Sequence, residues 1–284
     1  MEKIRVGGVP EHFNLPWHLA IENNLFASQG LEIEWVVFKG GTGAMTQALR
    51  NNEIDVCILL TEGIVADIVN SNPSKIIGQY IKTPLIWGVF SGAKNPISHY
   101  GEIYKKQYAI SRYGSGSHLM PQVDAFNKGL RLNDDQFTII KNLDGALKSL
   151  SNIETDVFYW EKYTTKPYVD QGILKHLGDY VTPWPCFMIT ATDDAIATKE
   201  DALSKMLDVI YFTTKQFMSA VNTIEEVSKR YNQKIEDVEN WFYSTEWAID
   251  RKVSTKMVDN VLYTLKKAGI IEQTVPIKEI LKLV

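Results

Sequence analysis

Short apolar runs alternate with amphipathic stretches along the first sixty residues. The run 4–9 predicts a strand, and the loop 10–17 leads from it into an amphipathic helix. A second strand at 33–38 passes through Gly-Gly-Thr-Gly (40–43) into another helix, and the stretch 48–58 ends in a third strand. In such strand–loop–helix units, the loops at the carboxyl ends of the strands carry ligand residues, and helix N-termini favour anions.

The same order of elements returns in the middle of the chain. Strands are expected at 106–111, 137–141, 155–160 and 173–177. Helices are expected after the loops 112–118 and 142–145 and, as a short helix, after Glu161-Lys-Tyr163. The repetition predicts a second lobe that is built on the plan of the first.

The segments between these two parts are interpreted as strands and crossings. The runs 74–81 and 85–90 predict two strands around Thr83-Pro84, which we expect to form a hairpin. The break at 91–96 predicts a crossing to the second lobe, because Gly, Asn and Pro interrupt the apolar pattern there. The segment 183–191 is interpreted as the return crossing.

From residue 196 onward the pattern is mainly helical. We therefore expect one lobe from residues 1–91 together with 192–284, and a second lobe from residues 92–191. The C-terminal helices (224–284) either cover the first lobe or form a subunit interface. The length of 284 residues fits two such lobes.

Composition narrows the class of protein. The chain is 45% hydrophobic and 23% charged, so it can bury a core, and its net charge of -4 comes without a basic stretch. Nucleic acid and anionic membranes are therefore not expected as partners. No apolar run approaches the ~20 residues that span a bilayer, so no membrane insertion is expected. Cys57 and Cys186 lie in apolar runs and are interpreted as free core thiols, with a disulfide as the alternative.

Two glycine-rich loops each admit two interpretations. Gly40–Gly43 is either a tight turn or a helix start, capped by Thr42, that presents N–H groups to a ligand. It is neither a phosphate loop with Gly-Lys-Ser/Thr nor a G-x-G-x-x-G motif. In Gly114–His118 the glycines allow close backbone approach, and Ser115 and Ser117 either cap a helix or donate to an anion. His118 either binds the ligand or faces solvent.

Two acidic dipeptides follow predicted strands at matching places in the two lobes. They are Thr61-Glu62 and Trp160-Glu161. Glu62 and Glu161 either recognise a cationic or N–H-rich group together, or are solvated acids in the first turns of helices. No Ser-His-Asp order, nucleophile elbow or H-E-x-x-H motif is present, and no Cys/His cluster predicts a metal site. We therefore predict no catalytic residues, no metal and no cofactor.

The chain resembles the type 2 periplasmic solute-binding protein superfamily, in particular the branch that binds sulfonates, taurine, nitrate and thiamine-pyrimidine precursors. The motifs that carry the resemblance are Pro16-x-x-x-Ala20, Asn24-Leu-Phe26, Gly30-Leu-Glu-Ile33, Gly41-x-Gly43, Ala48-Leu-x-x-x-Glu-Ile-Asp55 and Gly114-Ser-Gly-Ser117. They cover residues 4–60 and 105–160 best. Asn24 stands where the family usually has glycine. A signal-less subgroup from fungi and bacteria, without an assigned ligand, is the alternative placement.

The resemblance implies an α/β protein of two lobes, each a mixed sheet flanked by helices, joined by two hinge crossings. A ligand would lie in the cleft between the lobes, which would close around it. Trp160 or Tyr113 is expected to stack on the ligand. The predicted ligand-binding residues are Phe13, Asn14, Gly41, Thr42, Thr61, Glu62, Tyr113, Ser115, Ser117, His118, Trp160 and Glu161.

Two functions follow from the resemblance. The first is capture of a small, anion-bearing organic ligand, as in the substrate-binding components of ABC transporters, with a permease as a possible partner and the protein a monomer or dimer. The second is a cytoplasmic enzyme on the same scaffold, a lyase or synthase of the menaquinone or thiamine-pyrimidine type. Glu62, Glu161 or His12 could then serve as its base. The sequence shows no signal peptide, which predicts a cytoplasmic protein, or a periplasmic or cell-surface one if a signal was removed.

Overall fold

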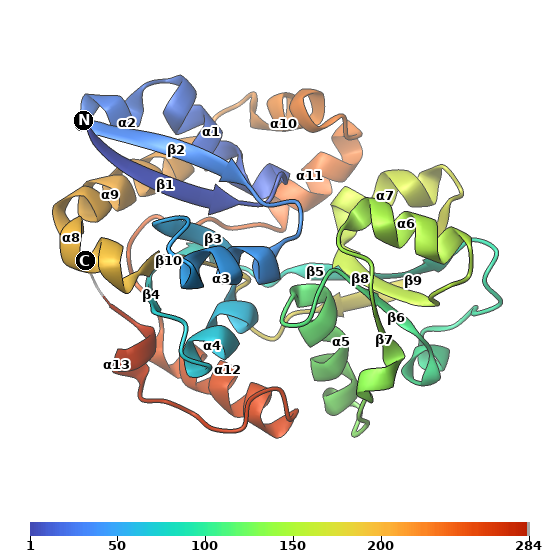
Figure 1. Cartoon of the computed structure of the whole chain (residues 1–284). Helices are drawn as coiled ribbons and strands as arrows, with labels where there is room; N and C mark the ends of the chain where they lie inside the picture. Colours follow the sequence, from blue (N-terminus) through green and yellow to red (C-terminus); the bar gives the residue numbers. More distant parts are fainter. Residues whose placement is uncertain (283–284) are drawn as a thin grey trace.

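The computed structural model describes residues 1–282 and arranges them around two sheets of five strands each (Figure 1). The first sheet has the order β2-β1-β3-β10-β4, and the second has the order β7-β6-β8-β5-β9. The strands of the first sheet are β1 (Glu2–Gly8), β2 (Leu31–Val37), β3 (Val56–Leu60), β4 (Ser74–Ile81) and β10 (Phe187–Thr192). Those of the second are β5 (Ile86–Gly92), β6 (Tyr108–Ile110), β7 (Phe137–Ile139), β8 (Val157–Glu161) and β9 (Leu174–Val181).

Both sheets are mixed and follow one plan. In the first sheet β1 is parallel to β2 and β3, while β10 is antiparallel to β3 and β4. In the second sheet β6 is parallel to β7 and β8, while β5 is antiparallel to β8 and β9. Helices flank both sheets (Figure 1). The predicted fold class is therefore confirmed.

Helices of the first sheet come from both ends of the chain. They are η1 (His12–Asn14), α1 (Leu15–Glu22), α2 (Leu25–Ser28), α3 (Thr42–Arg50), α4 (Thr61–Val69), α8 (Asp193–Thr198), α9 (Glu200–Ser219), α10 (Thr223–Tyr231), α11 (Ile235–Tyr243), α12 (Thr255–Lys267) and α13 (Ile277–Ile280). Those of the second sheet are η2 (Tyr100–Lys105), α5 (Gly116–Asn127), η3 (Asp134–Gln136), α6 (Leu143–Ser151) and α7 (Lys162–Asp170). We call each sheet with its helices the first half and the second half.

The chain passes between the halves twice, at 82–85 and at 182–186. The predicted hairpin of 74–81 with 85–90 is wrong, because β4 pairs with β10 whereas β5 pairs with β8 and β9. The first crossing therefore precedes β5 instead of following it at 91–96. Thr83-Pro84 lies in this crossing. The hairpin prediction failed because a turn signal gives no information about the partners of its flanking strands.

Each crossing leads directly into a strand of the half that it enters. The strand β5 lies in the second sheet and β10 in the first, although the predicted division at 91–92 and 191–192 assigned them the other way round. The return segment Pro183-Trp184-Pro185 does connect the two sheets. The exact extent of the lobes as moving units stays a prediction.

The C-terminal helices cover the first sheet (Figure 1). Helix α9 packs on α1, and α12 packs on α4. Isolated bridges pair Ile76 with Leu281 and Ile81 with Trp247, so the C-terminal segments also dock along β4. Trp247 is fully buried there, and its Nε1 donates to the Phe13 carbonyl at 3.1 Å.

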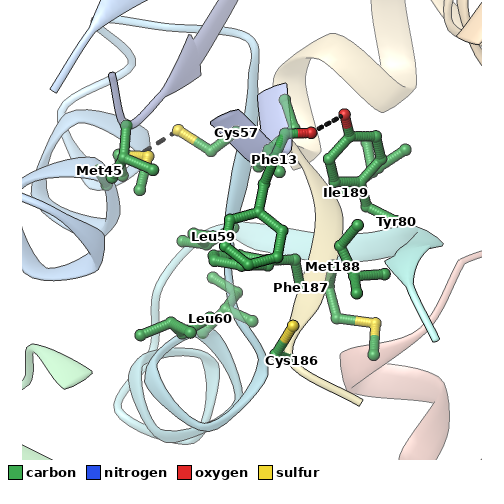
Figure 2. Packing of buried hydrophobic residues seen from close by; sticks show 14 of the residues in the cluster. Phe13, Met45, Cys57, Leu59, Leu60, Tyr80, Cys186, Phe187, Met188 and Ile189 are labelled. Carbon is green, nitrogen blue, oxygen red and sulfur yellow. Dashed lines mark hydrogen bonds between the residues drawn. The ribbon is translucent and has the colours of Figure 1, made fainter. Parts of the chain in front are cut away.

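The core beneath the first sheet reaches the loop after β1. Figure 2 shows the Tyr80 hydroxyl pointing to the Phe13 carbonyl, to which it donates at 2.7 Å. The Phe13 ring lies 5.2 Å from that of Phe187, between ring centroids. Cys57 and Cys186 are buried and unpaired, as expected for core thiols. Among the described residues, no helix combines the length and the apolar character that crossing a membrane requires.

Candidate functional site

A pocket lies between the two halves and is lined by residues of both. The carboxyl ends of parallel strands and the amino ends of β5 and β10 meet there. From the first half it is lined by Val9, Glu11, Gly41, Thr42, Leu60 and Phe187. From the first crossing it is lined by Leu85, and from the second half by Trp87, Ser111, Ser115, Gly116, Ser117, Trp160 and Glu161.

The N-termini of two helices reach this pocket, one from each half. Helix α3 starts at Thr42 after Gly41, and α5 starts at Gly116 after Ser115. Neither helix has a side chain that caps its first N–H groups. The first turns of both helices therefore keep backbone donors for another acceptor, at the positive ends of the two helix dipoles.

Glycines allow side chains to pack closely against the two helix starts. A Cβ at Gly43 would lie 2.6 Å from the Cδ of Arg112 and 3.5 Å from the Ser115 nitrogen, across the space between the halves. A Cβ at Gly116 would lie 2.4 Å from Leu60 and from Trp87. A side chain at Gly43 would collide with Arg112, and one at Gly116 with Leu60 and Trp87. The Gly40–Gly43 segment is a turn and leads into the start of α3, but Thr42 does not cap that helix as expected, because its hydroxyl accepts from Leu60. The presentation of the helix N–H groups to a ligand stays a prediction.

The hydroxyl groups at the start of α5 form a connected set. The Ser111 nitrogen donates to Ser117 Oγ at 2.9 Å, and Ser117 Oγ lies 3.0 Å from Ser115 Oγ. Ser115 Oγ in turn donates to the Arg112 carbonyl at 2.7 Å. On the other side of the pocket, Thr42 Oγ1 accepts from the Leu60 nitrogen at 3.2 Å. These bonds fix the orientation of the polar wall.

Two carboxyl groups complete the polar lining. The pKa of Glu11 is raised to about 8 by three effects together. Burial raises it most, the charge of the neighbouring Glu161 also raises it, and a hydrogen bond with Trp160 lowers it. Burial likewise raises the pKa of Glu161 to about 7, against the hydrogen bonds from Thr164. Glu161 Oε2 accepts from the Thr164 nitrogen at 2.6 Å and so caps α7. Burial therefore favours the protonated form of both carboxyls.

Aromatic rings form the apolar walls. Trp160 stacks on Phe158 with 5.2 Å between ring centroids, and Phe187 is backed by Phe13. Trp87 is buried, and its Nε1 donates to Thr182 Oγ1 of the return crossing at 2.9 Å. Flat rings on both sides of a small pocket suit a flat or short organic ligand.

Six of the predicted ligand-binding residues line this pocket: Gly41, Thr42, Ser115, Ser117, Trp160 and Glu161. Their contact with a ligand stays a prediction. Sequence reasoning missed Glu11, although it follows the strand 4–9 directly in a loop already expected to carry ligand residues. It missed Trp87 and Phe187 because the strands that they begin were assigned to the wrong lobes.

Two pairs of predicted ligand-binding residues, Phe13 with Asn14 and Thr61 with Glu62, do not line the pocket and lie behind it. Phe13 and Asn14 are buried in η1, and Asn14 Nδ2 donates to the Val9 carbonyl at 2.9 Å. Thr61 Oγ1 donates to the Pro185 carbonyl at 2.6 Å, and Glu62 Oε2 accepts from Trp184 Nε1 at 2.9 Å. The second pair thus binds the return crossing. The sequence could not show this, because the partners lie more than 120 residues away.

Tyr113 and His118 line a separate pocket between α4 and α5. Tyr113 is exposed, and its ring lies 4.9 Å from that of His118. Burial lowers the pKa of His118 to about 4. His12, considered as a base, is buried with its ring 4.0 Å from that of Trp241, and burial lowers its pKa to about 3. In residues 1–282 no group of three His, Cys, Asp or Glu side chains could hold a metal ion.

We expect the effect of Glu62→Gln on the free energy of unfolding to be more favourable at pH 8 than at pH 5. The difference between the two pH values should be about 2 kcal/mol. Burial raises the pKa of Glu62 from 4.5 to about 7 in the folded state, against the hydrogen bond from Trp184. The stability that this acid contributes is complete below pH 4.5 and is lost as the pH rises to about 7. Glutamine stays neutral at every pH, so the variant avoids the cost of burying a charge. In the parent protein, Glu62 Oε1 is buried and has no hydrogen-bond partner.

Denaturant unfolding of the parent and the Glu62→Gln variant at both pH values measures this difference. Any pH-independent cost of the extra amide N–H cancels in the comparison. An equal effect of the substitution at pH 5 and pH 8 would show that Glu62 ionises normally in the folded protein.

Comparisons with known proteins agree with this architecture. The family model described as Ca3427-like PBP matches residues 87–180. The structure of the Candida albicans CA3427 gene product, described as having the generic periplasmic binding protein fold, is 26% identical, with a TM-score of 0.92 over 99% of this chain and 96% of that one. No match is found among curated protein sequences.

Two sulfonate-binding proteins share the fold. The alkanesulfonate-binding protein SsuA from Xanthomonas axonopodis pv. citri, bound to MOPS, is 12% identical, with a TM-score of 0.84 over 100% of this chain and 99% of that one. The periplasmic aliphatic sulphonate binding protein SsuA from Escherichia coli is 16% identical, with a TM-score of 0.73 over 99% and 97%. The predicted resemblance to proteins with the periplasmic binding protein fold is therefore confirmed.

Proposed function

On the premise that this chain has the periplasmic binding protein fold, we propose that it captures a small, anion-bearing organic solute in the pocket between its two halves. One observation carries the proposal. The uncapped starts of α3 and α5, one from each half, line the same pocket. An anionic group placed there would accept backbone N–H bonds from both halves at once, so its binding would favour the closed arrangement.

The connections between the halves suit a hinge. Within residues 1–282, only the two crossings at 82–85 and 182–186 join the sheets covalently. On the far side of α7, Lys166 lies 3.3 Å from Asp237 and Lys234 lies 2.6 Å from Asp170, so ion pairs link the second half to α11 of the first. Such partly exposed pairs contribute little energy and can open and reform. Hinge closure around the ligand is part of the proposal.

The structural neighbours support a sulfonate or a similar anion as the first class to test, because two of them are described as sulfonate-binding. An ABC permease as the partner is proposed on the same ground, since a protein from Staphylococcus aureus with this fold is described as the ligand-binding component of an ABC-type import system. Its structure is 13% identical to this chain, with a TM-score of 0.75 over 100% of this chain and 97% of that one.

Thermal unfolding against a panel of sulfonates, nitrate, aminopyrimidines and aromatic carboxylates tests capture. A ligand at about 100 times its dissociation constant stabilises the folded state by about 2.7 kcal/mol. For a chain of this length we expect the melting temperature to rise by about 5–10 °C. A panel without any shift, on protein stripped of bound compounds by unfolding and refolding, would contradict the proposal.

An enzyme on the same scaffold is the second candidate. It is favoured by the pKa values of Glu11 and Glu161, because carboxyls that titrate near neutral pH suit general acid–base catalysis. Incubation of a stabilising compound with the protein, followed by mass spectrometry, separates the two functions. Complete recovery of the unchanged compound supports capture, whereas a product whose formation Glu161→Gln abolishes supports catalysis.

A further inference from the structure

Another cavity lies at the boundary of the two halves, beside the pocket at the starts of α3 and α5, which we call the central pocket. Its volume is about 310 Å³. The first half lines it with the loop after β1, the end of α10 and the turn that follows α10. The second half lines it with the start of α6 and with α7, which lies next to α11 (Figure 1). Because one water needs about 10–15 Å³, the cavity has room for a small molecule.

Three residues that line this cavity carry polar atoms whose hydrogen-bonding capacity is unused. His12 Nε2, Thr164 Oγ1 and Gln233 Oε1 are buried and have no hydrogen-bond partner among residues 1–282. His12 and Gln233 belong to the first half, and Thr164 belongs to the second. Buried polar atoms without a partner are rare in folded proteins, because each one costs free energy. Three of them around one cavity point to a molecule that pairs with them.

The polar groups around the cavity are neutral. No lysine, arginine or aspartate of the described residues lines it, and Glu11, which also lines the central pocket, is the one acid there. Burial favours the protonated form of Glu11. Burial also lowers the pKa of His12 to about 3, so its imidazole is neutral at physiological pH. A charged molecule would lose its hydration here without meeting an opposite charge, so the cavity favours an uncharged ligand.

Amide groups and phenol rings make up most of the remaining lining. The amides belong to Gln171, Asn232 and Gln233, and the rings to Tyr168 and Tyr231. A hydroxyl group suits such a surface, because it can donate to an amide oxygen and accept from an amide nitrogen, and it pairs with either tautomer of a neutral imidazole. The phenol rings offer flat apolar surface on which the C–H face of a sugar ring can pack.

We propose that this cavity is a second binding site, for an uncharged molecule with several hydroxyl groups, such as a sugar or a cyclic polyol. The bound molecule contacts both halves, because both line the cavity. The site is separate from the central pocket, and its existence does not depend on anion capture there.

Calorimetry with D-glucose, D-ribose and myo-inositol tests the site. Two controls are gluconate, a charged relative of glucose, and cyclohexanol, a ring with a single hydroxyl. We expect at least one of the three test compounds to bind with a Kd of about 1 mM or tighter. Both controls should bind at least about 10-fold more weakly than that compound, because one has a charge and the other lacks the hydrogen-bonding groups. Absence of binding by all three, or equal binding of either control, overturns the proposal.

Two variants remove unpartnered groups with little change in side-chain volume. Thr164→Val and Gln233→Leu should each weaken the binding of the sugar or polyol by about 5-fold or more. The melting temperature of Thr164→Val should stay equal or rise, since the hydroxyl has no partner to lose. Gln29→Ala, at an exposed position after α2, should keep the full affinity. Unchanged affinity in both cavity variants contradicts the proposal.

Ser117→Asp distinguishes this site from the central pocket, which Ser117 lines. The variant should keep its affinity for the sugar or polyol. A loss as large as that in Thr164→Val would place the compound in the central pocket and overturn the second site. A protein that binds the sugar or polyol but no anion of the thermal panel contradicts the proposed function and leaves this inference intact.

Discussion

Ser117→Asp is expected to weaken the binding of an anionic ligand by about 100-fold. Ser117 is buried at the start of α5 and lines the pocket, with its hydroxyl 3.0 Å from that of Ser115. A carboxylate there would accept the free N–H groups in place of the ligand. Two like charges about 5 Å apart repel each other by about 3 kcal/mol at an effective dielectric constant of about 20, which corresponds to this loss of affinity.

Ser117→Ala is the matched control, because it removes the hydroxyl without adding charge. We expect it to weaken binding by less than about 10-fold, since it removes one neutral hydrogen-bonding group. Calorimetry with the strongest anion from the thermal panel measures both variants, and circular dichroism checks that they fold. Equal affinities of Ser117→Asp and the parent would exclude the start of α5 from the site.

Trp247→Ala is expected to destabilise the protein by about 3–5 kcal/mol, as for other fully buried tryptophans. The Trp247 ring packs against Phe217 and Trp241, with ring centroids 5.0 Å and 5.4 Å away. Its Nε1 also binds the Phe13 carbonyl, in the loop that follows β1 and carries Glu11. The substitution therefore opens a cavity and also loosens the loop at one wall of the pocket.

Urea unfolding followed by tryptophan fluorescence and circular dichroism measures this loss. Trp247→Phe keeps most of the packing and removes the N–H, so it should cost less than the alanine variant. Tyr243→Ala truncates an exposed aromatic side chain at the end of α11 and should change stability by about 0.5 kcal/mol or less. A loss at Trp247 as small as that at Tyr243 would contradict the docking of the C-terminal segment on the first sheet.

Local patterns in the sequence determined the elements and their order. Apolar runs with a loop and an amphipathic stretch after them predicted β1 to β3 and β6 to β8, and the family motifs supplied the two-lobed α/β fold. The glycine-rich segments at 40–43 and 114–118 identified the two helix starts that line one pocket. These predictions succeeded because hydrophobic periodicity and glycine at a close approach are properties of neighbouring residues.

Only the tertiary structure decided which strands pair and which side chains share the pocket. The strand β5 follows the first crossing into the second sheet and β10 follows the return crossing into the first, which brings Trp87 and Phe187 to the site. Glu62 binds Trp184 of the return crossing, whereas Glu11 takes a place beside Glu161. Such contacts join residues more than a hundred positions apart. The local sequence around a turn or an acidic residue does not depend on which distant residue it contacts. The sequence therefore determined the elements, whereas the packing of the two halves determined which side chains line the pocket.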